Sequence, residues 1–126
     1  MPTFTGGCHC GAVRFEVDGT LEGVTLCNCS ICTVKGYLHW IVPRAQFRLV
    51  AGGDALSTYR FGTGVAQHHF CRTCGVASFY VPRSHPDGVD VNVRCLGDVE
   101  IDALPVRRFD GRHWEASIGA LKGADS

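Results

Sequence analysis

The chain has 126 residues, a length that suits one domain, and we predict a single domain over residues 1–126 with its core at about 7–118. Twelve lysines and arginines balance twelve acidic residues, so no basic excess indicates nucleic acid as a partner. No apolar run approaches the roughly 18 residues of a membrane span, and the N-terminus lacks the apolar segment of a secretion signal. We therefore expect a cytoplasmic protein with neither a nucleic-acid nor a membrane partner.

Short alternating runs and 16 glycines predict strands along most of the chain. The clearest strand spans residues 12–17, where Val13, Phe15 and Val17 share one face. Further strands are predicted, in chain order, at residues 37–42, 56–61, 65–70, 76–81, 89–94 and 112–118.

The helical pattern is nearly absent from the chain. Single helical turns are predicted at residues 30–35, with Ser30 as the cap, and at residues 43–47. A tight connection is predicted at residues 62–64 and a loop at 82–88, from their glycines and prolines. The fold class is therefore a small all-β protein with minor helical turns.

Seven of the eight cysteines fall into three close groups, a spacing typical of metal ligands. The groups are Cys8 with Cys10, Cys27 with Cys29 and Cys32, and Cys71 with Cys74. The outer two groups together supply four thiolates, the complement of a closed tetrahedral zinc site. The middle group supplies three and leaves one position for water or substrate, as in a catalytic site. The sequence predicts two zinc ions per chain, one structural and one catalytic.

The outer pairs lie some sixty residues apart, so a shared zinc would hold distant parts of a sheet together. Gly11 and Gly75 follow these pairs and suit tight turns that aim backbone N–H groups at sulfur. We therefore predict that this site stabilises the fold.

A disulfide framework is the alternative for eight cysteines in a short chain. Cysteines two residues apart cannot easily adopt disulfide geometry, and clustered cytosolic cysteines are more often metal ligands or redox groups. Cys71 and Cys74 also match a redox CxxC motif, but no strand–helix alternation surrounds them. We favour metal sites, and interpret Cys95, outside the three groups, as a buried apolar cysteine.

The fourth ligand of the middle group stays open at this point. A histidine would close the site, and the candidates are His9, His39, His68, His69, His85 and His113. His68 and His69 should alternate across a strand, so at most one of them faces any given site. We favour an exogenous ligand, because catalytic zinc sites keep an open position.

Three thiolates give a zinc site a net charge near minus one, which makes it a weak activator of water. Such a site suits exchange of water for a soft ligand, a substrate thiol held as thiolate at neutral pH. The implied reaction forms or breaks a carbon–sulfur bond with a small electrophile. Lys35, Tyr37 and His39, just beyond the middle group, are the expected pocket residues.

Three runs of sequence resemble, in order and spacing, the glutathione-dependent formaldehyde-activating enzyme family, whose domain is shared with centromere protein V. They are Gly7-Cys8-His9-Cys10-Gly11, Cys27-Asn28-Cys29-Ser30-Ile31-Cys32 and His69-Phe70-Cys71-Arg72-Thr73-Cys74-Gly75. The resemblance implies a β-tent fold related to the Mss4-like zinc proteins and condensation of formaldehyde with glutathione to S-hydroxymethylglutathione. It also implies a structural zinc on Cys8, Cys10, Cys71 and Cys74 and a catalytic zinc on Cys27, Cys29 and Cys32.

Two functions from different classes remain open. The first is a zinc-dependent carbon–sulfur lyase or synthase, in which the middle group binds glutathione or a similar small thiol and an aldehyde is the second substrate. The second is a non-catalytic, zinc-stabilised binding module of the Mss4-like type. An exchangeable site that binds small thiols would distinguish them, because a scaffold needs no open coordination position.

Overall fold

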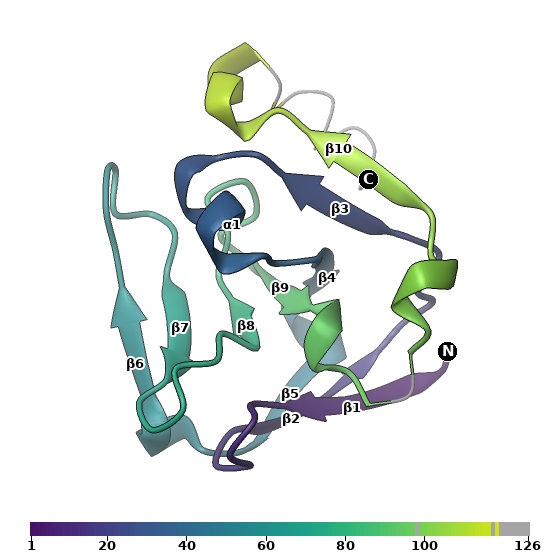
Figure 1. The fold of residues 1–126 in the computed structure, drawn as a ribbon. Coiled ribbons are helices and arrows are strands. Elements are labelled where there is room, and N and C mark those ends of the chain that lie inside the picture. Colours follow the sequence, from purple (N-terminus) through teal and green to yellow (C-terminus); the bar gives the residue numbers. More distant parts are fainter. Residues whose placement is uncertain (98, 117, 119–126) are drawn as a thin grey trace.

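The computed structural model describes residues 1–97, 99–116 and 118, whose strands form three small sheets (Figure 1). The first is antiparallel, in the order β1 (Thr3–Gly7), β2 (Arg14–Asp18) and β5 (Phe47–Ala51). The second has the order β10 (Val106–Phe109), β3 (Val24–Cys27), β4 (His39–Pro43), β9 (Gly88–Asn92) and β8 (Phe79–Tyr80). The third pairs β6 (Leu56–Tyr59) with β7 (His68–Cys71). The predicted small all-β class is confirmed.

Among the described residues, helical structure is limited to short elements between the strands and after the last one. The helix α1 (Ser30–Lys35) follows β3. Single 3-10 turns lie at Arg44–Gln46, Gly53–Ala55, Val93–Cys95, Ile101–Ala103 and Gly111–His113. Within the described part of the chain, no helix is long and apolar enough to cross a membrane.

Most predicted elements are confirmed with shifted ends. Strands occur within six of the seven predicted ranges, although β8 contains only Phe79 and Tyr80. The helical turns at residues 30–35 and 43–47 are also present. Four strands were not predicted, namely β1, β3, β5 and β10.

The strand predicted at residues 112–118 is wrong. Residues 111–113 form a 3-10 turn and residues 114–116 continue as helix, while residue 117 lies outside the described residues. Local hydrogen bonds explain the difference, because the N–H of His113 donates to the carbonyl of Asp110 and the His113 ring contacts the Asp110 carboxylate. These contacts close a helical turn, so residues 111–116 do not pair with a neighbouring strand.

The alternating pattern of β2 forms part of the hydrophobic core, as predicted. Val13, Phe15 and Val17 are all at most 1% exposed. The Phe15 ring stacks on Phe47 of β5 at a centroid distance of 5.2 Å, and Phe47 contacts Phe79 of β8 at 4.7 Å. The aromatic contacts therefore pack the first sheet against the second.

The five-stranded sheet has two chemically different faces. One face contributes Val24, Trp40, Val42, Val89 and Val91 to the core cluster. The register pairs Thr25 with His39, Ile41 with Asp90, and Tyr80 with Asp90, so these side chains share the opposite face. That opposite face lines the cavity described below.

Gly52 fixes the loop that contains the first two cysteines. Its φ is +93°, and a Cβ there would lie 2.7 Å from the Cα of Val13 and closer still to the carbonyl oxygen of Ala12. A Cβ on the neighbouring Gly53 would meet only the Leu49 side chain, at 3.6 Å.

We expect Gly52→Ala to lower the free energy of unfolding by about 1–3 kcal/mol, because it adds both a steric clash and an unfavourable φ. Gly53→Ala is the matched control and should change stability little. Denaturant unfolding of the metal-loaded variants measures both. Equal effects of the two substitutions would show that the close approach at Gly52 does not constrain this loop.

Candidate metal centres and the adjoining cavity

The first candidate centre combines Cys8 and Cys10, from the loop after β1, with Cys71 and Cys74, at the end of β7 and in the turn that follows. All four sulfur atoms lie within 4.8 Å of one another. The Sγ atom of Cys10 is 3.6 Å from those of both Cys8 and Cys71. Tetrahedral zinc with Zn–S bonds of about 2.3 Å separates its sulfurs by roughly 3.8 Å. The four thiols therefore fit one closed metal site.

Backbone N–H groups point at the sulfurs of this centre. The N–H of Val13 donates to Cys8 Sγ at 3.3 Å, and that of Cys74 donates to Cys71 Sγ at 3.5 Å. Such contacts orient metal ligands and stabilise thiolates.

The turns of this centre have the predicted glycine conformation. The φ angles of Gly11 and Gly75 are +85° and +79°. The backbone N–H groups of Cys10 and Val76 lower the pKa of the Cys74 thiol to about 6. A thiol with that pKa is largely ionised at neutral pH, which favours cation binding.

The second candidate centre is formed by Cys27 at the end of β3 and by Cys29 and Cys32 around the start of α1. Their sulfurs also lie within 4.8 Å of one another. The helix cap is Cys29 and not Ser30 as predicted, because Cys29 Sγ accepts a hydrogen bond from the N–H of Cys32 at 3.4 Å. All six histidines are among the described residues, and none joins these sulfurs in a ligand group.

The three thiols of this centre compete for ionisation. Hydrogen bonds from the thiols of Cys27 and Cys32 lower the pKa of Cys29 to about 2. The contact with Cys29 raises the pKa of Cys27 to about 11, and the pKa of Cys32 is raised further by its contacts with both neighbours. Three thiolates this close repel one another, and a divalent cation would remove that repulsion. The donor set therefore fits a metal ion.

Asn28 attaches the segment after β10 to this centre. Its side chain donates to Asp110 Oδ1 at 3.0 Å and accepts from the N–H of Arg112 at 3.0 Å. The Arg112 Nε also donates to the Asn28 carbonyl at 2.9 Å. Asn28 was not predicted from the sequence, although its side chain can both donate and accept hydrogen bonds and it lies between two candidate ligands.

Gly111 lies directly against the second centre. A Cβ at this position would be 2.5 Å from Cys27 Sγ and 2.8 Å from Cys29 Cβ. Gly111 was not predictable from the sequence, because its contact with the cysteines depends on the parallel pairing of β10 with β3.

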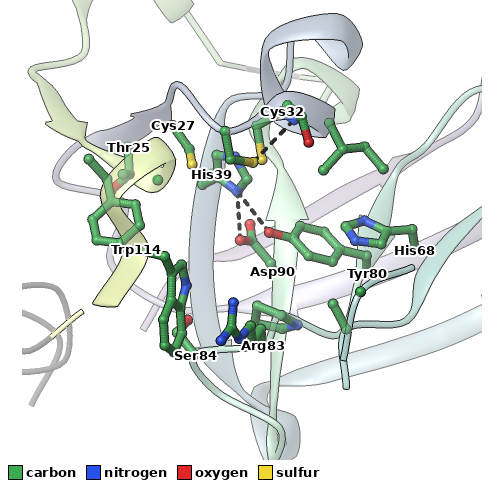
Figure 2. A pocket seen from close by; sticks show the side chains of 18 of the residues that line it. Thr25, Cys27, Cys32, His39, His68, Tyr80, Arg83, Ser84, Asp90 and Trp114 are labelled. Atoms are coloured by element: carbon green, nitrogen blue, oxygen red, sulfur yellow. Dashed lines mark hydrogen bonds and ion pairs between the residues drawn. The ribbon is translucent and has the colours of Figure 1, made fainter. Parts of the chain in front are cut away.

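A cavity of about 460 Å³ opens beside the second centre (Figure 2). All three cysteines of that centre line it, and no cysteine of the first centre does. Its wall includes the polar face of the five-stranded sheet, and aromatic and basic side chains complete it. These further lining residues include Phe61, His68, Arg83, Phe109, Arg112 and Trp114.

His39 and Asp90 form a buried pair in the cavity wall. His39 Nδ1 lies 2.7 Å from Asp90 Oδ2, and the two residues are 5% and 1% exposed. The Tyr37 hydroxyl donates to the backbone carbonyl of Asp90 at 2.6 Å. His39 Nε2 and Asp90 Oδ1 have no hydrogen-bond partner among the described residues. His39 was expected in the pocket from the sequence, whereas Asp90 was not, although its place among the apolar residues of β9 was an available signal.

Only one of the three expected pocket residues lines the cavity, and it is His39. Tyr37 is buried behind the wall at 2% exposure. Lys35 Nζ lies 3.2 Å from His68 Nδ1 and 4.8 Å from the centre of the Tyr80 ring. Burial lowers the pKa of Lys35, and burial with the nearby Lys35 charge lowers that of His68 to about 4.

Of the remaining histidine candidates, only His68 lines the cavity. His68 lines it, whereas His69 contacts Thr58 Oγ1 at 2.8 Å, so the predicted alternation is confirmed. His9, His85 and His113 do not line the cavity either. Cys95 is partly rather than fully buried, and its burial raises the pKa of its thiol to about 11. All eight cysteines are free of disulfides.

We expect Gly111→Ala to lower metal affinity at the second centre about 10–100-fold, the usual effect of disturbing the surroundings of metal ligands. The first centre should keep its metal. Elemental analysis after dialysis against a weak chelator measures both, with Gly53→Ala as the control that crowds no ligand. Unchanged metal content in Gly111→Ala would show that the approach of this segment does not constrain the site.

The chain is similar to several known proteins. The family model described as glutathione-dependent formaldehyde-activating enzyme matches residues 3–109. A Halomonas elongata protein named "Putative glutathione-dependent formaldehyde-activating enzyme" is 35% identical over 81 residues, which are 57% of this chain and 52% of that protein. The chain thus spans about half the length of this curated relative.

A solved structure supports the fold. The crystal structure of a Rhodobacter sphaeroides protein is similar, with a TM-score of 0.74 and 36% identity, and the match covers 82% of this chain and 99% of that one. Because the family model covers most of the chain and the fold agrees, the chain belongs to the glutathione-dependent formaldehyde-activating enzyme family.

Proposed function

We propose that the chain is a zinc-dependent carbon–sulfur lyase or synthase that joins a small thiol to an aldehyde, or separates them. Cys27, Cys29 and Cys32 would hold the catalytic zinc. The observation that carries the proposal is the cavity beside this three-cysteine group, which has no protein residue as a fourth ligand among the described residues. A metal site that is open to a cavity has room for a substrate ligand.

Glutathione and formaldehyde are the substrates that the family description indicates. Zinc bound at these cysteines would supply a Lewis acid that keeps a thiol ionised at neutral pH. Arg83 and Arg112 line the same cavity, and their charges suit the carboxylates of glutathione or a similar anionic thiol. The chain's part is therefore to bind the thiol, orient it and shield the reacting atoms from water.

For the other centre, we propose a structural zinc on Cys8, Cys10, Cys71 and Cys74. Four sulfurs complete a tetrahedral site, and none of these residues lines the cavity. A β-tent fold of the Mss4-like type and a cytoplasmic location belong to the same proposal, since reactive zinc thiolates require a reducing compartment. The competing interpretation is a non-catalytic, zinc-stabilised binding module.

The chain purified in the presence of zinc should contain two zinc ions, and Cys29→Ser should contain one. Three protein ligands hold metal less tightly than four, so samples are reconstituted with zinc before elemental analysis. One zinc per wild-type chain after reconstitution would remove the catalytic centre from the proposal.

The two centres should differ in their effect on stability. Cys71→Ser should prevent stable folding, because structural zinc contributes roughly 10–16 kcal/mol while a whole domain is stable by only about 5–15 kcal/mol. Cys29→Ser should fold with a melting temperature close to that of the wild type. Thermal melts that show equal damage from both substitutions would mean that both centres are structural.

Thiol binding and turnover distinguish the enzyme from the binding module. Glutathione, and then cysteine, should change the visible spectrum of the cobalt-substituted wild type but not that of Cys29→Ser. The wild type should also accelerate S-hydroxymethyl adduct formation from formaldehyde above the spontaneous rate, measured against Cys29→Ser at equal concentration. If no thiol alters the cobalt spectrum, the binding-module interpretation is correct.

A further inference from the structure

We propose that His39, oriented by Asp90, exchanges a proton with the substrate through its Nε2 atom. This inference rests on the proposed function and assigns a catalytic role to a residue outside the cysteine groups. The His39–Asp90 pair occupies the wall of the cavity that the three cysteines of the second centre also line (Figure 2).

The register of the five-stranded sheet places His39 next to Asp90. On β4 and β9, His39 lies opposite Asn92 and Ile41 lies opposite Asp90, so His39 and Asp90 are diagonal neighbours on one face. Tyr80 of β8 lies opposite Asp90 on the other side. Strand pairing therefore fixes the backbone positions of both residues, which gives the precise placement that a catalytic side chain needs.

The hydrogen bond between the pair selects the tautomer of His39. An ionised carboxylate only accepts hydrogen bonds, so Nδ1 must carry the proton in its 2.7 Å contact with Asp90 Oδ2. In neutral His39, Nε2 then has a free lone pair and is a proton acceptor. The Tyr80 hydroxyl is 3.4 Å from Nδ1, a longer contact than that with Asp90.

The unpartnered Nε2 is the second observation behind the proposal. Buried polar atoms in proteins almost always have a hydrogen-bond partner. His39 is 95% buried, given its 5% exposure, and Nε2 has no partner among the described residues. Because His39 lines the cavity, a ligand that approaches Nε2 from there would supply the missing partner.

Lys35, a charged group close to this wall, is already engaged. Lys35 Nζ contacts His68 Nδ1 at 3.2 Å and lies over the rings of Tyr37 and Tyr80. His68 lines the cavity, but its Nδ1 is occupied by this contact. Of the two histidines that line the cavity, His39 is therefore the one paired with a carboxylate, which fixes its tautomer.

In the direction of synthesis, the S–H bond of the thiol breaks and its proton moves to His39 Nε2. The sulfur electron pair forms the bond to the carbonyl carbon while the C=O π pair moves to oxygen. That oxygen takes the proton from Nε2, which returns His39 to its neutral form and gives the S-hydroxymethyl adduct. In the reverse direction, Nε2 takes the hydroxyl proton, the carbonyl forms, the C–S bond breaks, and the sulfur recovers the proton. Asp90 stabilises the transient imidazolium.

The first test measures catalysis in variants that keep their metal. His39→Gln should retain two zinc ions and the thiol-induced cobalt spectrum, yet lower kcat about 100-fold or more, the usual range for loss of a proton-transfer group. His69→Gln is the matched control, because it removes a histidine that faces away from the cavity, and it should retain activity. If His39→Gln loses the second zinc, His39 is a ligand and the inference is overturned. A kcat within twofold of the wild type overturns it as well.

The second test does not depend on activity. Nitrogen-15 NMR of the wild type should show His39 as the Nδ1–H tautomer, and Asp90→Asn should shift it toward Nε2–H with zinc content unchanged. An Nε2–H tautomer in the wild type would overturn the inference even if the His39→Gln variant failed to fold. Failure of the proposed function can be told apart from failure of this inference. A wild type that binds no thiol would contradict both the proposed function and the role of His39. Normal turnover by the wild type together with an active His39→Gln would contradict the role of His39 alone.

Discussion

Close contact among cysteine sulfurs is the interaction on which this structure depends. Both groups hold their sulfurs within 4.8 Å, a spacing at which several thiolates are compatible only with a cation between them. In the first centre, Cys10 and Cys71 meet although 61 residues separate them. Bringing such segments together costs chain entropy, which metal binding offsets. Metal binding at the first centre would therefore be coupled to folding, whereas the second centre, formed by residues 27–32, needs little long-range closure.

Strand register connects this scaffold to its chemistry. In β4 and β9, Trp40, Val42, Val89 and Val91 belong to the core while His39 and Asp90 line the cavity. A slip of one residue would exchange these faces, placing polar groups in the core and apolar groups in the cavity. The hydrophobic pattern that stabilises the sheet thus also places the proposed proton-transfer pair, so selection for a stable core maintains the geometry of the site.

Local spacing in the sequence was enough to predict the cysteine groups, the α1 turn and the buried face of β2. Contacts made by distant residues were not predictable in this way. Asn28 and Asp110 meet across 82 residues through the parallel β10–β3 pair, which brings Gly111 onto the cysteines. The alternation of apolar and polar residues in β9 favours a strand with one solvent-exposed face, yet all five of its residues are buried. Asp90 was not predicted as a site residue, because sequence alone does not show that a cavity wall covers a polar face.

The burial of the His39–Asp90 pair helps to distinguish an enzyme from a binding module. A buried carboxylate and imidazole lose hydration, and replacing such a pair by apolar residues is often neutral or stabilising. His39 and Asp90 each keep one polar atom without a partner among the described residues, so their mutual contact does not satisfy them fully. A zinc-stabilised scaffold would gain nothing from this arrangement. The proposed chemistry gives a reason for it, because a proton transfer between thiol and aldehyde needs an unpaired nitrogen in the wall of the cavity that the three cysteines also line.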